Sequence, residues 1–208
     1  MDSKYRPRII DAQISDLLRC MGAIVLEGAK WCGKTTTGEH HANSAIFMDD
    51  PKRRRQYQLF AEDNPDAILD GATPRLIDEW QLTPIIWDAI RFRVDHKPGV
   101  GQYILSGSAK PADRSEIYHS GSGRFAWMRM RPMSLQESGE SSGAVSLSRI
   151  FKTSDIQISA ESKSNLEKTA FQICRGGWPH SIDLPSDVAL TPARQYYNAI
   201  VNVDRLTT

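Results

Sequence analysis

The stretch "GAIVLEGAKWCGKTTT", residues 22–37, decides the fold. Residues 23–27 are rich in apolar and β-branched side chains and have a glycine on either side, which predicts a buried strand. The chain then matches the pattern G-x-x-x-x-G-K-[ST] at every fixed position, and residues 35–41 are expected to form a helix. A loop of this composition between a strand and a helix is suited to binding phosphate.

Each residue type in this loop has a chemical reason. Glycines let the backbone wrap closely around a phosphate, so that successive N–H groups point inward. Lys34 supplies a mobile cation for the β- and γ-phosphates of a nucleotide, and Thr35 supplies a hydroxyl ligand for Mg²⁺. We therefore expect the nucleotide to be bound by Gly28, Ala29, Lys30, Trp31, Cys32, Gly33, Lys34, Thr35 and Thr36.

A second motif, "RLIDEWQ" at residues 75–81, offers the carboxylates that hydrolysis needs. Asp78 ends an apolar strand and is expected to hold Mg²⁺ together with Thr35, as a Walker-B aspartate does. Glu79 follows at the mouth of the site, where a catalytic carboxylate can orient the attacking water. The spacing of 44 residues from Lys34 to Asp78 leaves room for an additional strand between the motifs. This insertion is typical of the P-loop class with a catalytic glutamate, which includes AAA+ ATPases.

Two further polar residues are candidates for the catalytic site. Ser106 ends the predicted strand 102–108 and is expected to lie between the two motifs, where it can contact the γ-phosphate or the water; a plain Ser-Gly turn is the alternative. Arg124 lies in a glycine-rich loop before the predicted strand 125–132. It is expected to stabilise charge on the γ-phosphate, in cis or from a neighbouring subunit, and a surface arginine is the alternative. The sequence has no [NT]-K-x-D motif for reading guanine, so ATP is the expected nucleotide.

The remaining elements complete an α/β pattern. The predicted strands are residues 23–27, 45–49, 74–79, 102–108 and 125–132, and the predicted helices between or before them are 9–21, 35–41, 51–63 and 84–96. Pro51 stands where the first residue of a helix is expected. Helix 84–96 places Ile85, Ala89, Phe92 and His96 roughly on one face. The alternation predicts an α/β fold with a mostly parallel, five-stranded sheet covered by helices. The loop motif and the inserted strand are what place this fold among P-loop NTPases of AAA-like type.

The composition of the chain changes after residue 135. Residues 136–150 are rich in Ser and Gly and are expected to form a linker, while residues 166–182 and 192–208 have helical patterns. We therefore expect a P-loop domain over residues 1–135 and a small, mainly helical segment over 151–208. About 60 residues are marginal for an independent domain, so we expect the chain to be an N-terminal piece of a longer protein.

Composition restricts the choice of partners. The formal net charge is +1, which gives no overall electrostatic case for nucleic acid or a membrane surface. Three separated cysteines without a CxxC pattern fit a reducing cytosol better than a disulfide framework or a zinc site. The sequence shows neither a signal peptide nor an apolar run long enough to span a membrane, so we expect a cytoplasmic protein.

Together these motifs resemble a known family, the bacterial and archaeal AAA-type ATPases of the AAA_14 group that carry a C-terminal DUF4143 domain. The resemblance begins with an arginine-bearing helix, "YRPRIIDAQISDLL", and continues through "GAKWCGKTT", in which Ala29 and Lys30 replace the usual Pro and Arg. It extends through "DEWQ", "LSGS", "GR", "PMSLQE" and finally "GGWP" at residues 176–179. The resemblance implies an ATPase domain over most of the chain, followed by the beginning of the DUF4143 domain.

Three functions remain open at this point. The first is Mg²⁺-dependent ATP binding and hydrolysis, with Glu79, Arg124 and Ser106 in the catalytic roles. The second is a nucleotide-regulated binding module with slow or absent hydrolysis, associated with DNA through the basic run "PKRRRQ" at residues 51–56. The third is a small-molecule kinase, which ranks last because no arginine cluster suited to a lid follows the acidic motif.

Overall fold

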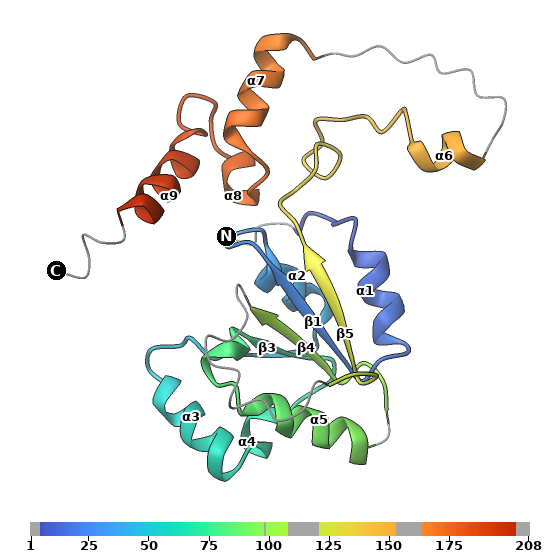
Figure 1. Cartoon of the computed structure of the whole chain (residues 1–208), viewed down its shortest axis with the longest axis vertical. Coiled ribbons are helices and arrows are strands. Elements are labelled where there is room, and N and C mark those ends of the chain that lie inside the picture. Colours follow the sequence, from blue (N-terminus) through green and yellow to red (C-terminus); the bar gives the residue numbers. More distant parts are fainter. Residues whose placement is uncertain (1–4, 98, 108–120, 153–163, 203–208) are drawn as a thin grey trace. The chain divides into compact units, whose positions relative to one another are not determined.

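The computed structural model describes residues 5–97, 99–107, 121–152 and 164–202. The chain divides into two compact units, Met1–Arg131 and Pro132–Thr208 (Figure 1). No helix in the described ranges is long and apolar enough to cross a membrane.

The first unit is built on one sheet of five strands. These are β1 (Ala23–Gly28), β2 (Ser44–Phe47), β3 (Arg75–Asp78), β4 (Tyr103–Gly107) and β5 (Phe125–Met130). Their spatial order is β2-β3-β4-β1-β5, and every neighbouring pair is parallel. The predicted parallel α/β fold is therefore confirmed, and β2 is the additional strand expected between the two motifs.

Helices cover both faces of this sheet (Figure 1). One face carries α1 (Asp11–Leu18) and α2 (Lys34–His41), and the other carries α3 (Arg54–Asp63), α4 (Asp66–Leu69) and α5 (Ile86–His96). Alternate side chains of β1 serve the two sides, because successive side chains of a strand point to opposite faces. Ala23 and Val25 join the core under α3, α4 and α5, whereas Ile24 and Leu26 join the core under α1.

Two predicted helices differ from the observed ones. Helix α3 begins at Arg54 rather than Pro51, because residues 51–53 form a turn after β2. In α5, Ala89, Phe92 and His96 share a face as expected and line one surface pocket, but this is not the most buried face of the helix. The residues of α5 that are fully buried are Ile86, Trp87 and Ile90, whereas Phe92 is 56% exposed and lines an open surface pocket. The indole of Trp87 stacks on Phe125 of β5 at a centroid distance of 4.1 Å.

The second unit contains α6 (Leu147–Lys152), α7 (Leu166–Arg175), α8 (Pro179–Ile182) and α9 (Thr191–Val201). Helix α6 begins inside the predicted linker. The predicted helical run 166–182 is two helices, because Gly176 adopts φ +73° at the end of α7. A Cβ on the next residue, Gly177, would lie 2.2 Å from the carbonyl oxygen of Met133, so the backbones approach too closely for a side chain there.

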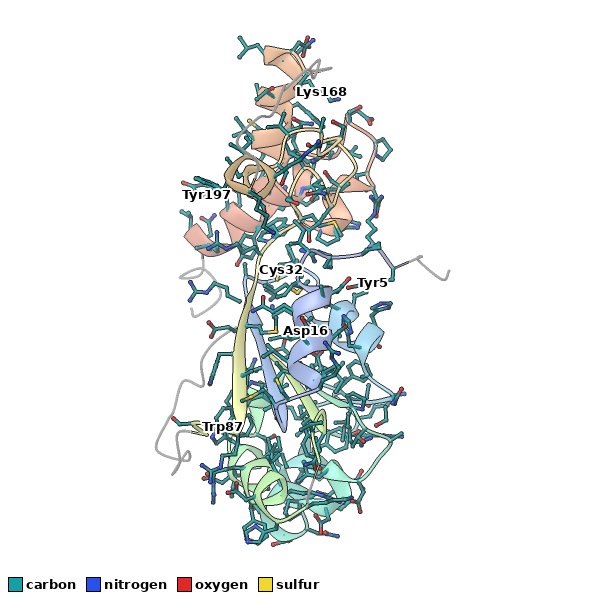
Figure 2. All side chains as sticks on the ribbon, turned by 90° about the vertical axis from the view of Figure 1, so that its right-hand side faces the viewer. Tyr5, Asp16, Cys32, Trp87, Lys168 and Tyr197 are labelled. Carbon is teal, nitrogen blue, oxygen red and sulfur yellow. The ribbon has the colours of Figure 1, made fainter. Side chains whose placement is uncertain are left out.

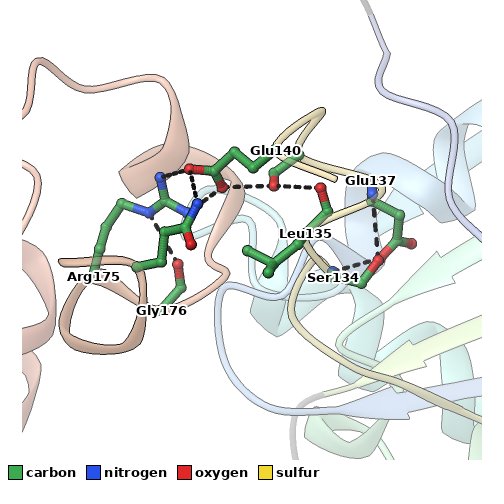
Figure 3. Close-up of polar contacts among 8 residues, drawn as sticks. Ser134, Leu135, Glu137, Glu140, Arg175 and Gly176 are labelled. Atoms are coloured by element: carbon green, nitrogen blue, oxygen red, sulfur yellow. Dashed lines mark hydrogen bonds and ion pairs between the residues drawn. The ribbon is translucent and has the colours of Figure 1, made fainter. Parts of the chain in front are cut away.

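A partly buried ion pair anchors α7 to the turn at residues 134–140 (Figure 3). The guanidinium of Arg175 donates to both carboxylate oxygens of Glu140, at 2.9 and 2.6 Å, and Gln172 and Ser138 also donate to this carboxylate. The hydrogen bonds from Arg175 are the main reason that the pKa of Glu140 falls to about 2. The adjoining turn is closed by reciprocal hydrogen bonds between Ser134 and Glu137, of the kind found in a capping box.

Candidate nucleotide-binding site

The motif residues meet at one edge of the sheet, where the carboxyl ends of the parallel strands lie together. Gly28 ends β1, Asp78 ends β3, and Ser106 lies in register with Asp78 near the end of β4. Strand β4 lies between β1 and β3, as expected for Ser106. Ligands of open parallel α/β sheets bind at this edge, so the fold places the two motifs where a ligand site is expected.

Close packing and backbone conformation require the two glycines of the loop. A Cβ on Gly28 would lie 2.1 Å from the carbonyl oxygen of Met130 on the neighbouring strand. Gly33 adopts φ +98° immediately before α2, a left-handed conformation that disfavours residues with a Cβ. The loop thus leaves β1 against β5 and turns directly into α2, whose amino end carries the positive end of the helix dipole.

Lys34 is the first residue of α2 and is only 7% exposed. Its ammonium group donates hydrogen bonds to the carbonyl oxygens of Gly28 and Ala29, at 3.0 and 2.9 Å. The positive charge of Lys34 is therefore held against the first turn of the loop, within the ring of residues expected to surround the phosphates.

Thr35 and Asp78 come together at the base of the loop. The hydroxyl of Thr35 donates to Oδ2 of Asp78 at 3.0 Å and lies 3.2 Å from Oδ1, although the residues are 43 positions apart. Ser106 is fully buried, and its hydroxyl donates to Oδ1 of the same carboxylate. A hydroxyl and a carboxylate are the oxygen ligands that Mg²⁺ prefers, so this donor set fits the expected ion.

The environment of Asp78 shifts its acidity. Burial raises the pKa of its carboxyl group above the ordinary value, although the hydrogen bonds from Ser106 and Thr35 act in the opposite direction. In the described part of the chain, no group of three His, Cys, Asp or Glu side chains gathers as a metal cluster. The hydroxyl of Thr35 and the carboxylate of Asp78 would fit a Mg²⁺ ion only if phosphate and water supplied its other ligands.

Glu79 follows Asp78 with a left-handed backbone, φ +52°. A non-glycine residue in this conformation is strained, and such strain occurs often at functional sites. The amide of Gln81 donates to the Glu79 carboxylate across a short 3₁₀ turn, Trp80–Leu82, which was not predicted. The carboxylate is therefore oriented by its own chain at the end of β3.

Arg124 does not lie at this edge. It precedes β5, and its carbonyl oxygen accepts a hydrogen bond from the N–H of Ala23, the first residue of β1. Its guanidinium donates to Asp95 at 2.7 Å. Figure 2 labels Cys32 of the loop near the top of the first unit and Trp87, which stacks on Phe125 at the start of β5, well below it. Arg124 lies where β1 and β5 begin, whereas the P-loop lies where β1 ends. The length of a strand therefore separates Arg124 from the loop, and the expectation that it reaches the γ-phosphate of its own subunit is wrong.

The other predicted loop residues differ in exposure. Cys32 is fully buried, and burial raises the pKa of its thiol. Trp31 is 54% exposed with φ +63°, and the ammonium of Lys30 lies 5.8 Å from its ring centroid. Ala29 and Thr36 are also exposed. Of these residues, only Cys32 packs into the protein interior.

Arg8 was not among the predicted site residues. Its side chain is 7% exposed and donates 2.8 Å hydrogen bonds to the carbonyl oxygens of Cys32 in the loop and Arg131 after β5. Arg8 lies in the arginine-bearing stretch "YRPRIIDAQISDLL" that contributes to the family resemblance, but its position before an apolar helical pattern gave no reason to place it at the loop, since most charged residues lie at the surface.

Strand β1 leads through the glycine loop into α2, and β3, which carries Asp78, lies two places away from β1 in the sheet. This arrangement defines a P-loop nucleotide-binding domain. A family model for the AAA domain, AAA_14, matches residues 21–139, more than half of the chain. The chain therefore belongs to the AAA_14 family. The match covers β1 to β5 and ends before α6. No curated protein matches the chain. Family membership indicates a nucleotide-binding domain of the AAA ATPase type.

Proposed function

We propose that this protein binds ATP with Mg²⁺ and hydrolyses it to ADP and phosphate. The observation that carries the proposal is the contact of 3.0 Å between the Thr35 hydroxyl and the Asp78 carboxylate, directly beside the loop that holds Lys34. Two motifs that are distant in sequence thereby supply an ion site and a phosphate site at one edge of the sheet.

Each residue has a defined task in this proposal. The loop N–H groups and Lys34 bind the phosphates, and Thr35 and Asp78 provide two oxygen ligands for Mg²⁺. When bound, the ion neutralises the charge that develops on the phosphates. Ser106 keeps the Asp78 carboxylate in place, since its proton is donated to that group. Glu79 accepts a hydrogen bond from the attacking water and aligns it with the γ-phosphate.

Steady-state hydrolysis tests the role of Glu79. Glu79→Gln should lower the turnover number by about 100-fold or more, in the range for loss of a general base, while ATP still binds. Glu39→Gln is the matched control, because Glu39 is an exposed glutamate on α2. A Glu79→Gln protein that turns over ATP at the wild-type rate would refute the catalytic role.

The arginine that contacts the γ-phosphate would come from a neighbouring copy. Arg124 is 48% exposed in its side chain, and it lies at the edge of the sheet opposite the loop of its own subunit. We therefore propose a homo-oligomer in which Arg124 acts in trans. Turnover per subunit should then rise with protein concentration, and Arg124→Ala should remove that rise without changing ATP affinity.

Residues 151–208 are proposed to belong to a DUF4143-like domain, on the strength of the "GGWP" stretch at residues 176–179. The residue boundaries expected from the sequence, 135 and 150, are part of that proposal. The task to which hydrolysis is coupled would be carried out through this domain.

The alternative is a nucleotide-regulated module that binds DNA and hydrolyses ATP slowly or not at all. It is favoured by the basic run 52–55, in which all four side chains are exposed at the start of α3. A gel shift with short duplexes at two salt concentrations tests it, because phosphate contacts weaken steeply as salt rises. Binding that is unchanged in Lys52→Glu and Arg54→Glu would refute this version.

A further inference from the structure

The segment that precedes α1 is fixed against the P-loop by a buried arginine. The backbone N–H of Arg8 donates to Oδ2 of Asp11 at 2.7 Å, and this carboxylate also accepts from Tyr5 at 2.7 Å. The phenol ring of Tyr5 stacks on His40 of α2 at a centroid distance of 3.8 Å. Arg8 therefore begins from an anchored backbone, close to the helix that follows the loop.

The guanidinium of Arg8 connects two carbonyl groups from distant parts of the first unit. One nitrogen donates to the Cys32 oxygen and the other to the Arg131 oxygen, each at 2.8 Å. The planar guanidinium presents several N–H donors in a fixed fork, so one side chain can hold two acceptors at once, which a lysine ammonium does less well. The fork joins the loop to the end of β5.

The contact with Cys32 sets the direction of a peptide group in the loop. The peptide unit between Cys32 and Gly33 is planar and trans, so its N–H points opposite to its carbonyl oxygen. Because Arg8 holds that oxygen, the N–H of Gly33 is turned away from Arg8. Phosphate-binding loops require their N–H groups to converge on the anion, so the orientation of this peptide matters for binding.

We infer that Arg8 is a positioning residue for the P-loop: it orients the Cys32–Gly33 peptide so that the Gly33 N–H is ready to donate to a nucleotide phosphate. This inference rests on the proposed nucleotide binding. Arg8 itself does not contact the phosphate, and it acts through the carbonyl oxygen of Cys32.

ATP affinity tests the inference in the full chain, at a temperature where each variant is folded. Arg8→Ala should raise the dissociation constant for Mg–ATP by about 10-fold to 100-fold, the range for residues that orient the groups touching a bound ion. Arg8→Lys should recover part of the loss, because an ammonium can reach one carbonyl at a time. Arg19→Ala is the matched control, since Arg19 is exposed and pairs only locally with Asp16 among the described residues.

Hydrogen exchange without nucleotide separates this inference from the proposed function. Arg8→Ala should speed amide exchange in residues 28–37 and leave β3 unchanged, and Arg8→Lys carries the same comparison if Arg8→Ala does not fold. Unchanged exchange in the loop overturns the inference, whether or not ATP binds.

Faster exchange with no ATP binding by the wild-type protein supports the positioning of the loop and refutes the nucleotide function. An affinity for ATP that stays at the wild-type value in both variants also overturns the inference.

Discussion

The ion pair between Glu140 and Arg175 makes the stability of the second unit depend on pH. The folded pKa of Glu140, about 2, lies below its ordinary value of 4.5, so the folded state favours the carboxylate. The stabilisation is therefore complete above pH 4.5 and is lost as the pH falls towards 2. The difference of about 2.5 between the two pKa values corresponds to about 3 kcal/mol.

Solvent contact lowers the expected value. The Glu140 side chain is 20% exposed and the Arg175 side chain 7% exposed, so we expect screening to reduce the contribution to about 2 kcal/mol. Glu140→Gln should lower the free energy of unfolding of the second unit by this amount at pH 7. At pH 2 the two proteins should have nearly the same stability.

Urea unfolding followed by the indole N–H signal of Trp178 in NMR spectra is the assay, because Trp178 reports on the second unit alone. Glu167→Gln is the control on α7, the helix of Arg175, where an exposed side chain should change stability by about 0.5 kcal/mol or less. A loss in Glu140→Gln that is the same at pH 7 and pH 2 would refute the electrostatic reasoning, since only the charged carboxylate is stabilised by Arg175.

Three further predictions concern the first unit. Gly38→Ala should destabilise it by up to about 2 kcal/mol in urea unfolding, because a Cβ would lie 2.7 Å from the Leu76 side chain. This overpacking outweighs the gain of about 1 kcal/mol in helix propensity. A gain in stability would contradict the prediction. Trp87→Leu should cost about 3 kcal/mol in the same assay, since the indole is 2% exposed among aromatic neighbours, and a cost below 1 kcal/mol would show that its packing is unimportant. Ser106→Ala should weaken ATP binding about 10-fold in the presence of Mg²⁺ only, because the Asp78 carboxylate loses the hydrogen bond that holds it in place. Calorimetry with Mg²⁺ and with EDTA measures both affinities. An equal loss with EDTA would argue against a role of Ser106 in positioning Asp78.

The parallel sheet and the meeting of the two motifs could be predicted because they depend on local patterns. A run of apolar residues ending in a glycine loop specifies a strand and its direction, and the carboxyl ends of parallel strands share an edge. Asp78 and Thr35 therefore had to be near each other once both strands were recognised. The contact between the Ser106 and Asp78 side chains follows from the register of β3 and β4.

Other features depend on tertiary packing that periodicity does not reveal. The sequence indicated which residues of α5 share a face but not which face is buried. Ile85 and Ile86 both fit an apolar pattern, and only packing against the sheet selects Ile86. Arg124 was predicted to reach the γ-phosphate because it lies in a glycine-rich loop. That loop precedes β5, however, and the loops that precede parallel strands lie at the edge of the sheet away from the P-loop. The arginine-bearing stretch that contains Arg8 was noted, but the contacts of Arg8 could not be predicted, since its two acceptors are backbone oxygens that carry no sequence signal.

Thermal unfolding with and without nucleotide tests the central claim most directly. Mg–ATP at a hundredfold excess over its dissociation constant should stabilise the wild-type protein by about 2.7 kcal/mol, and Mg–GTP should give a smaller effect. The stabilisation should disappear in Lys34→Ala and remain in Lys97→Ala, a control at an exposed lysine after α5. No stabilisation of the wild-type protein by ATP, or equal stabilisation of Lys34→Ala, would contradict the assignment of residues 28–36 as a nucleotide-binding loop.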